Sequence, residues 1–503
     1  METEFKNIFV NKSFLFVNFA LGIRVTGVNH GIAVLAAILR KHSYKVGVIN
    51  LTEELSENEF LDKIRSFIPS IVGFSCTSHQ FKYLIKYSKI LSKVAGILQL
   101  AGGVHATLSP SDILSRTDVR GVCVGEGEIP MVNLLNAINE GREIADTSGF
   151  FWKINGAIKK NPIPQFSYDL SSLEFPDYSI YPRDFVVRDW SVDRSLVAQK
   201  SDIKKYIEVM ISRGCPYNCH YCCNKALASV YPSSQGYFRL PSVEWSIQLL
   251  SSLLKQFPET EYIEFIDDLL IADKKWFLEF SKKYKVKINL PYRLCGRFEL
   301  MTPEIIGALK DSGCVRVLFG LESGDELLRA ELLNRHHSNA LILEKCKLVK
   351  ESGITICTLN IVGFPFETKK QMQATLELNK KIAPEFGTCY FFHPYKNTYL
   401  YELCEKSGLL KGDAEMHDIT SNYSRSFIKL TGMAENDCIK FQRKLTFYFF
   451  IQTLKYRSRV FLSSNTGIKR LLLILLIMRI LIKGVKLYYI DYIKPAKMAF
   501  VRK

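Results

Sequence analysis

The chain has 503 residues, of which 47% are hydrophobic and 23% are charged. This balance excludes an intrinsically disordered chain, and the length predicts about three domains of roughly 150 residues each. The net charge is +17, and residues 440–503 carry most of it, since they hold 15 Lys and Arg against one acidic residue, Asp491. The first residues are polar and charged, so we expect no secretory signal, a cytoplasmic location and reduced thiols at the 13 cysteines.

Strands and helices are predicted to alternate along the first part of the chain. Apolar residues at helical spacing predict helices at 31–40, 81–94 and 130–138. Apolar runs predict strands at residues 14–19, 46–49, 71–75, 97–101 and 122–124. This alternation predicts an α/β fold with a doubly wound parallel sheet, which binds ligands at the carboxyl ends of its strands. We assign residues 1–145 to this Rossmann-like domain.

Small and polar residues follow three of the predicted strands. Glycine pairs let a ligand approach the backbone closely, although ordinary turns use glycine as well. Because the carboxyl ends of parallel strands share one edge of a sheet, we expect these residues to form a ligand site. The candidate residues are Ser75, Thr77, Gly102, Gly103, His105, Thr107, Gly125 and Glu126.

A less regular segment, residues 146–200, follows this domain. Gly149 and Gly156 predict a small hairpin near its start. Four prolines between residues 162 and 182 then predict an extended linker between two domains.

A second α/β unit is predicted over residues 201–400. Its strands are predicted at residues 206–211, 262–266, 292–296, 315–320, 354–361 and 389–393. A helical pattern follows each of the first five strands. If these repeats form a barrel, its chemistry is expected on the loops after the strands.

Three cysteines follow the first strand of this unit. Cys215, Cys219 and Cys222 are spaced C-x3-C-x2-C, so three thiolates converge on one short loop. A four-iron cluster takes four ligands, so three cysteines leave one iron open to a small molecule. The alternative is a zinc site with His220 or Cys223 as the fourth ligand. Zinc sites favour a second pair of ligands further along the chain, and no such pair follows here.

The cysteine spacing, with Tyr221 before the third cysteine, resembles the signature of the radical S-adenosylmethionine (SAM) enzymes. With the Gly-Gly-x-His-Ala-Thr and Gly-Glu-Gly-Glu loops ahead of it, the chain resembles the cobalamin-binding (B12-dependent) members of that family. The resemblance implies a partial (β/α)6 barrel and a [4Fe-4S] cluster on Cys215, Cys219 and Cys222. It also implies SAM on the open iron and cobalamin in the N-terminal domain, where the glycines would admit its nucleotide tail.

The resemblance also implies which residues contact SAM. Asp267 and Asp268 follow the second strand and would receive its amino group, although Asp268 is alternatively the cap of the next helix. Glu322 and Ser323 follow the fourth strand and would meet the ribose hydroxyls. Arg297 would orient a carboxylate through two hydrogen bonds, or else form a surface ion pair. No catalytic side chain beyond these is identified.

The chain departs from the family pattern at three places. Where many cobalamin carriers have Asp-x-His-x-x-Gly, only Gly31 matches, and His30 lies out of register. This implies cobalamin without an imidazole below the cobalt, or a domain that has lost the cofactor. Phe366 replaces a glycine in the loop after the fifth strand, and residues 393–398 differ from the usual Pro-Gly-Thr.

Residues 401–503 are predicted to be helical and basic. Residues 471–478 are an apolar run, which is short for a membrane span of about 20 residues. This run is either a buried core helix or an interfacial helix whose flanking Lys and Arg contact lipid head groups. We expect no nucleic acid partner.

The expected activity is methyl transfer to an unactivated carbon of a small-molecule or lipid-like substrate. The resemblance implies a methyl group carried by cobalamin, a 5′-deoxyadenosyl radical made from SAM, and an external electron donor such as flavodoxin or ferredoxin. The alternatives are a cobalamin-dependent cyclisation or rearrangement, or a non-catalytic cobalamin- or metal-sensing protein. Peripheral contact with a membrane through the basic tail would accompany the cytoplasmic location.

Overall fold

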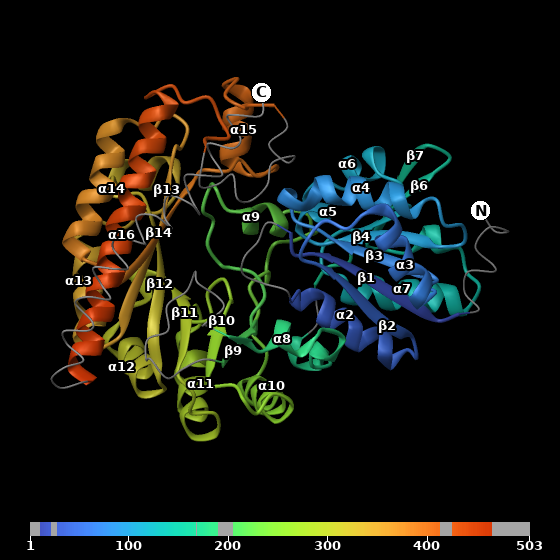
Figure 1. Ribbon diagram of the computed structural model, residues 1–503, viewed down its shortest axis with the longest axis horizontal. Helices are drawn as coiled ribbons and strands as arrows, with labels where there is room; N and C mark the ends of the chain where they lie inside the picture. Colours follow the sequence, from blue (N-terminus) through green and yellow to red (C-terminus); the bar gives the residue numbers. More distant parts are fainter. Residues whose placement is uncertain (1–10, 22–27, 167–168, 190–204, 413–424, 465–503) are drawn as a thin grey trace.

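The structure is a computed structural model that describes residues 11–21, 28–166, 169–189, 205–412 and 425–464. Two seven-stranded sheets lie side by side, each covered by its own helices, and the described parts of the connection from the first sheet to β8 are residues 161–166 and 169–187 (Figure 1). The short helix α9 lies at the junction between the two halves (Figure 1).

The first sheet has the strand order β2-β1-β3-β4-β5-β6-β7. Its parallel strands are β1 (Ser13–Phe19), β2 (Lys45–Leu51), β3 (Ile71–Ser75), β4 (Leu98–Gly102) and β5 (Gly121–Cys123). The hairpin β6 (Phe150–Ile154) and β7 (Ala157–Lys160) extends one edge in antiparallel fashion, so the sheet is mixed and not purely parallel. The α/β class predicted from the sequence is confirmed.

Helices cover both faces of the first sheet. One face packs against α2 (His30–Lys41) and α7 (Glu128–Asn139). The other face packs against α3 (Glu57–Phe67), α4 (Phe81–Leu91) and α6 (Pro110–Arg116), while α5 (Val104–Leu108) follows β4. Strand alternation explains the two cores, because Phe14 and Phe16 face α2 and α7 whereas Leu15 and Val17 face α3 and α4.

The second sheet is a curled half-barrel with the order β14-β13-β12-β11-β10-β9-β8. The two-residue strand β8 (Arg188–Asp189) is antiparallel, and its end of the sheet does not pair with β14, so the barrel stays open. The six parallel strands are β9 (Lys205–Val209), β10 (Tyr262–Phe265), β11 (Tyr292–Gly296), β12 (Cys314–Glu322), β13 (Thr355–Val362) and β14 (Phe386–Phe391).

Helices follow the strands of the half-barrel and cover its outer face (Figure 1). They are α10 (Val243–Gln256), α11 (Lys274–Lys287), α12 (Pro303–Asp311), α13 (Asn339–Glu351) and α14 (Lys369–Ile382). Two short helices, α8 (Arg183–Val186) and α9 (Cys223–Ala228), lie on either side of β9 in the sequence.

Among the described residues, two helices follow the last strand, α15 (Tyr399–Lys406) and α16 (Glu435–Ser464). Helix α16 runs along β14, where Phe449 packs so closely on Gly387 that a Cβ there would lie 2.4 Å from the ring. Within the described parts of the chain, no helix has the length and apolarity that crossing a bilayer requires. The apolar run at residues 471–478 lies outside the described residues.

Candidate active site

The cysteine loop, residues 210–222, leaves the carboxyl end of β9 at the mouth of the half-barrel. The backbone of Arg213 exchanges two hydrogen bonds of 2.9 Å with that of Arg239, which anchors the start of the loop. Gly214 follows with a φ of +73°, and a Cβ there would lie 2.6 Å from the carbonyl oxygen of Tyr237. Only glycine fits this position, so local geometry fixes how the chain approaches Cys215.

The three cysteines of the motif lie on this loop outside any disulfide. Burial raises the pKa of Cys215 to about 12, and the thiolate charges of Cys222 and Cys219 add to the shift because they lie nearby. Among the described residues, no three His, Cys, Asp or Glu side chains converge on a single metal-ion position. A four-iron cluster binds each thiolate through a different iron, so its ligands surround a cube and do not meet at a point.

Two side chains direct N–H donors at sulfur atoms of the loop. Arg297 Nη1 lies 3.5 Å from Cys219 Sγ, and Asn224 Nδ2 lies 3.6 Å from Cys222 Sγ. Hydrogen bonds to sulfur stabilise negative charge on thiolates and tune iron–sulfur clusters. The donors present therefore fit a thiolate-bound cluster at this loop.

Arg297 is not the surface residue that one alternative expected. It is 9% exposed, its guanidinium lies 3.6 Å above the ring of Tyr217, and its Nε donates to Glu299 Oε1 at 2.6 Å. The alternative of a surface ion pair is therefore wrong, because burial and stacking hold the side chain against the cysteine loop.

The two aspartates after β10 have different environments. Asp267 is buried, and its Oδ1 accepts the backbone N–H groups of Ile211 and Ser212 and the hydroxyl of Ser212 at 2.6 Å. Its Oδ2 is buried without a partner among the described residues, and burial raises the pKa of Asp267 to about 6. Asp268 is exposed and does not cap α11, whose N-cap is Asp273.

Glu322 is the last residue of β12, and Ser323 follows it; the two side chains have different environments. Glu322 is buried with a φ of +60°, and its Oε1 accepts the hydroxyl of Tyr221 at 2.8 Å. The guanidinium of Arg335 lies 3.6 Å from the same oxygen, while burial raises the pKa of Glu322. Ser323 is fully buried, and its Oγ accepts the backbone N–H of Asp325 at 3.2 Å. Glu322 thus faces the cysteine loop through Tyr221, whereas Ser323 is turned into its own loop.

A cavity of about 420 Å³ opens at the carboxyl edge of the first sheet. Most of the candidate residues predicted there line it: Ser75, Thr77, Gly102, Gly103, Thr107, Gly125 and Glu126. His105 is fully buried and is not part of the lining; its Nδ1 lies 3.2 Å from Ser78 Oγ, and its ring packs on Phe81.

Two glycines of the lining have backbone conformations that other residues rarely adopt. Gly103 has a φ of +98°, and a Cβ there would lie 3.0 Å from the carbonyl oxygen of Cys76. Gly125 has a φ of +87°, and a Cβ there would lie 2.7 Å from the hydroxyl of Tyr231. These glycines therefore keep the cavity mouth open and let a ligand approach the backbone.

Residues of the half-barrel close one side of this cavity. Tyr231 and Tyr237 line it, and the backbone N–H of Glu126 donates to the Tyr231 hydroxyl at 2.8 Å. Arg213, two residues before Cys215, donates to Glu128 at 2.7 Å. The sequence analysis missed these residues, since their partners lie far away in the chain and only the acidic Gly-Glu-Gly-Glu loop hinted at a basic partner.

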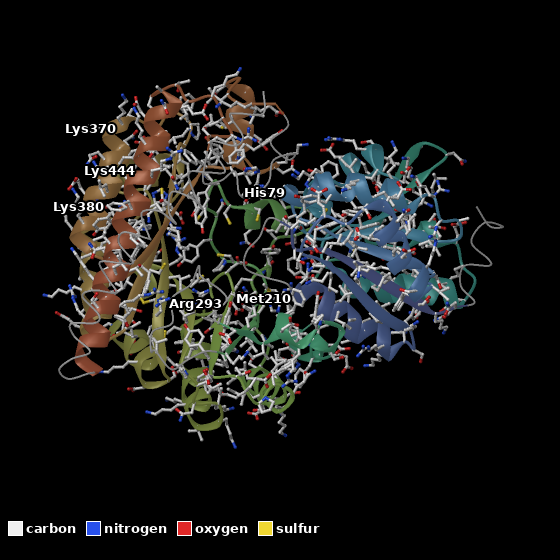
Figure 2. The ribbon with its side chains drawn as sticks, viewed as in Figure 1. His79, Met210, Arg293, Lys370, Lys380 and Lys444 are labelled. Carbon is white, nitrogen blue, oxygen red and sulfur yellow. The ribbon has the colours of Figure 1, made fainter. Side chains whose placement is uncertain are left out.

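A second contact between the two halves involves the 393–398 loop, which follows β14. The ring centroids of His393 and His79 are 4.3 Å apart, and the hydroxyl of Tyr395 lies 3.3 Å from His79 Nε2. Lys396 forms an ion pair with Asp112 of the first domain. Figure 2 shows His79 at the junction between the two halves. The 393–398 loop therefore docks on the first domain.

His30, which lies out of register with the histidine of the family pattern, does not line the cavity. Its Nδ1 lies 2.6 Å from the hydroxyl of Tyr178, and its Nε2 is buried without a partner in the described part of the chain. Burial lowers the pKa of His30 to about 4, so the imidazole is neutral.

The half-barrel is open and carries a three-cysteine loop at its mouth. It faces a Rossmann-like domain that has a cavity at its strand ends. Together these features define a class of proteins with two cofactor sites. Family models agree with both halves: the radical SAM superfamily matches residues 209–378, and the B12 binding domain matches residues 21–135. The chain therefore belongs to the radical SAM superfamily and carries a B12-binding domain.

Similar proteins span most of the chain. An uncharacterized methyltransferase of Pyrococcus horikoshii is 26% identical over 89% of this chain and 93% of its own length. An anaerobic magnesium-protoporphyrin IX monomethyl ester cyclase of Rubrivivax gelatinosus is 22% identical over 79% of this chain and 73% of its own. The fold resembles that of the radical SAM methyltransferase TsrM from Kitasatospora setae, with a TM-score of 0.63, 15% identity and coverage of 88% and 89%.

Proposed function

We propose that the chain is a cobalamin-dependent radical SAM methyltransferase that methylates a carbon of a small-molecule substrate. The observation that carries this proposal is the tie between the two candidate cofactor sites, because Arg213 of the cysteine loop pairs with Glu128 at the cavity of the B12-binding domain. A methyl donor and a radical source must act on the same substrate, which requires such neighbouring sites. Two of the similar proteins described above are methyltransferases.

When bound, the cluster, SAM and cobalamin supply the radical and the methyl group, with electrons from an external reductant. Cys215, Cys219 and Cys222 hold the cluster in this proposal, and Arg297 and Asn224 stabilise its charge through their N–H groups. Burial would shield the cluster most at Cys219, which is buried, and less at Cys215 and Cys222, which are half-buried.

The SAM contacts are proposed to be Asp267, Asp268, Glu322 and Arg297, with Ser323 acting on the loop that holds Glu322. Asp267 has a buried oxygen without a partner, so an ammonium group at this place would satisfy it. Glu322 already accepts one hydroxyl, that of Tyr221, which supports its assignment to the hydroxyl donors of SAM.

Cobalamin is proposed to bind at the loops after β3, β4 and β5, with its nucleotide tail in the cavity. Gly103 and Gly125 allow the close approach, and the rest of the set is Ser75, Thr77, Gly102, His105, Thr107 and Glu126. His105 does not reach the cavity, so its role in this proposal is to position the segment after β3 through the 3.2 Å contact of its Nδ1 with Ser78 Oγ.

Product analysis tests the proposal. The full chain is purified without oxygen, reconstituted with iron, sulfide and hydroxocobalamin, and reduced in the presence of SAM carrying a labelled methyl group. We expect 5′-deoxyadenosine and S-adenosylhomocysteine together. Cys219→Ala should abolish the 5′-deoxyadenosine, whereas Cys346→Ala, which removes a buried thiol on α13 far along the chain, should retain it.

A second candidate function is cyclisation or rearrangement with the same cofactors, which the similarity to the cyclase of Rubrivivax gelatinosus supports. The same experiment separates the two. Formation of 5′-deoxyadenosine without S-adenosylhomocysteine, and without label in any product, would favour cyclisation. A lipid-like substrate and membrane contact depend on residues 465–503, which the structure does not describe.

A further inference from the structure

We propose that the cavity of the B12-binding domain selects among corrinoids by the base of their nucleotide tail. It accepts an apolar base, such as the dimethylbenzimidazole of cobalamin, and rejects adenine, the base of pseudocobalamin. This inference rests on the proposed function, because it concerns the same cofactor site.

The cavity is deep as well as open. Its rim is formed by residues such as Ser75, the last residue of β3, whereas Phe14 lies near the start of β1. Since Asn18 pairs with Ser75 in the sheet, Phe14 lies four residues below the rim, or about 13 Å at 3.3 Å per residue. The cavity therefore extends from the strand ends into the layer between the sheet and its helices. Its volume of about 420 Å³ suits a flat base with its ribose and excludes the much larger corrin ring.

The deep walls of the cavity are apolar. Phe14 and Phe16 of β1, together with Leu100 of β4, form the sheet side. Leu35 of α2 and Met131 of α7 form the helix side. These side chains belong to the hydrophobic core of this face or pack against it, so they gain from contact with another apolar ring.

The amide side chains of the lining are already engaged. Asn29 accepts the N–H of Ile32 through Oδ1 and donates to Ser75 through Nδ2. Gln80 accepts the N–H of Thr77 through Oε1 and donates to the carbonyl of Phe19. An incoming purine therefore finds no unoccupied amide at either position.

Three further polar side chains of the lining, Thr107, Asn18 and Glu128, are paired as well. Thr107 donates to the carbonyl of Gly103 and accepts the N–H of Gly125, both at 3.0 Å. Asn18 donates to Asn50, while Glu128 accepts from Arg213. Adenine carries an amino group and several ring nitrogens, and burying them without partners costs at least about tenfold in affinity for one group. Dimethylbenzimidazole has methyl groups at the corresponding edge.

Binding of three corrinoids to the cofactor-free full chain tests the inference. The probes are hydroxocobalamin, pseudocobalamin with adenine as its base, and cobinamide, which lacks the nucleotide. We expect the Kd of pseudocobalamin to exceed that of cobalamin at least tenfold, and cobinamide to bind more weakly than cobalamin. Equal Kd values for cobalamin and pseudocobalamin would overturn the inference and leave the proposed function intact. If none of the three binds, both are overturned.

A cavity-filling variant gives a second, independent readout. Leu35→Phe should weaken cobalamin binding at least tenfold and leave cobinamide binding unchanged, because only the base enters the cavity. The matched control is Leu84→Phe on α4, in the core on the opposite face of the sheet, which should leave the ratio of the two Kd values unchanged. Equal loss of cobalamin and cobinamide binding in Leu35→Phe would contradict the inference.

Discussion

Phe366 has a backbone conformation that suits glycine. Its φ is +64°, and its side chain is 49% exposed, so it gains little from burial. A left-handed conformation costs a residue with a Cβ about 1–2 kcal/mol. The family pattern has a glycine at this position, and the left-handed backbone conformation is the physical reason why glycine is favoured there.

Phe366→Gly is expected to stabilise the protein by about 0.5–1 kcal/mol, since relief of strain exceeds the extra chain entropy of glycine. Urea unfolding of the cofactor-free chain measures the effect. Phe366→Ala is the control, because alanine keeps the unfavourable conformation. An equal gain in both variants would show that the aromatic side chain, and not the backbone, is the source of strain.

Glu367, the next residue, supports the same loop. Its Oε2 accepts the N–H of Gly363 at 2.6 Å and that of Phe364 at 3.2 Å. It does not cap α14, since Thr368 is the N-cap. Burial raises the pKa of Glu367 to about 8, above the usual value of 4.5.

This shift predicts a pH dependence of stability. Between pH 4.5 and 8 the folded state holds a proton on Glu367 that the unfolded state has released, so the free energy of unfolding falls as pH rises. Glu367→Gln mimics the protonated form and lacks this dependence. We expect the variant to gain on the order of 3 kcal/mol relative to the wild type from pH 5 to 8. A constant difference across this range would contradict the assignment.

At the scale of elements, a row of charged side chains crosses the inner face of the half-barrel. Glu208 pairs in register with Glu264, Glu264 with Arg293, and Arg293 with Arg316. All four are buried, and Glu264 Oε2 lies 2.5 Å from Arg293 Nη2 (Figure 2 labels Arg293). The row holds the strands β9 to β12 in one register, because a shift would bury unpaired charges.

Removing one member of the Glu264–Arg293 pair should lower the free energy of unfolding more than removing both. Arg293→Met leaves Glu264 buried without its partner, and we expect a loss of about 3–5 kcal/mol. The double variant Glu264→Leu/Arg293→Met should recover most of that loss. Urea unfolding of both variants and of the remaining single variant forms a double-mutant cycle. Additive losses would show that the two side chains do not stabilise each other.

Much of the fold was predictable from local sequence. Strands buried on both faces read as continuous apolar runs, so β1, β3 and β4 were predicted within a residue or two. Helix α3 was not predicted, because only Phe60, Leu61 and Ile64 of its residues are buried and the rest of the helix is polar. The charged row was also not predicted, since the sequence of one strand alone does not determine its register with the next strand.

The candidate site likewise has one part that the sequence predicts and another part that it does not. The cysteine motif spans eight residues of sequence, so it was visible without a structure. The contact between Arg213 and Glu128 joins residues 85 positions apart, and that between His79 and Tyr395 joins residues 316 apart. No local sequence pattern predicts such pairs, because they form only through the relative placement of the two sheets.

At the scale of the whole molecule, the Arg213–Glu128 pair ties the cysteine loop to the cavity at which we propose that cobalamin binds. Glu128 is 5% exposed, so the pair is largely screened from water. Arg213→Glu and Glu128→Arg should each weaken hydroxocobalamin binding about tenfold, and the double reversal should recover part of it. Titration of hydroxocobalamin into the cofactor-free chain measures this. If the double reversal recovers none of the lost affinity, the two residues act independently of each other.

The central claim is that Cys215, Cys219 and Cys222 bind a four-iron cluster. Iron and acid-labile sulfide in anaerobically reconstituted full-length protein test it most directly. We predict about four irons and four sulfides per chain in the wild type, and almost none when all three cysteines are replaced by alanine. Bound zinc without labile sulfide, or a full cluster in the triple variant, would contradict the account.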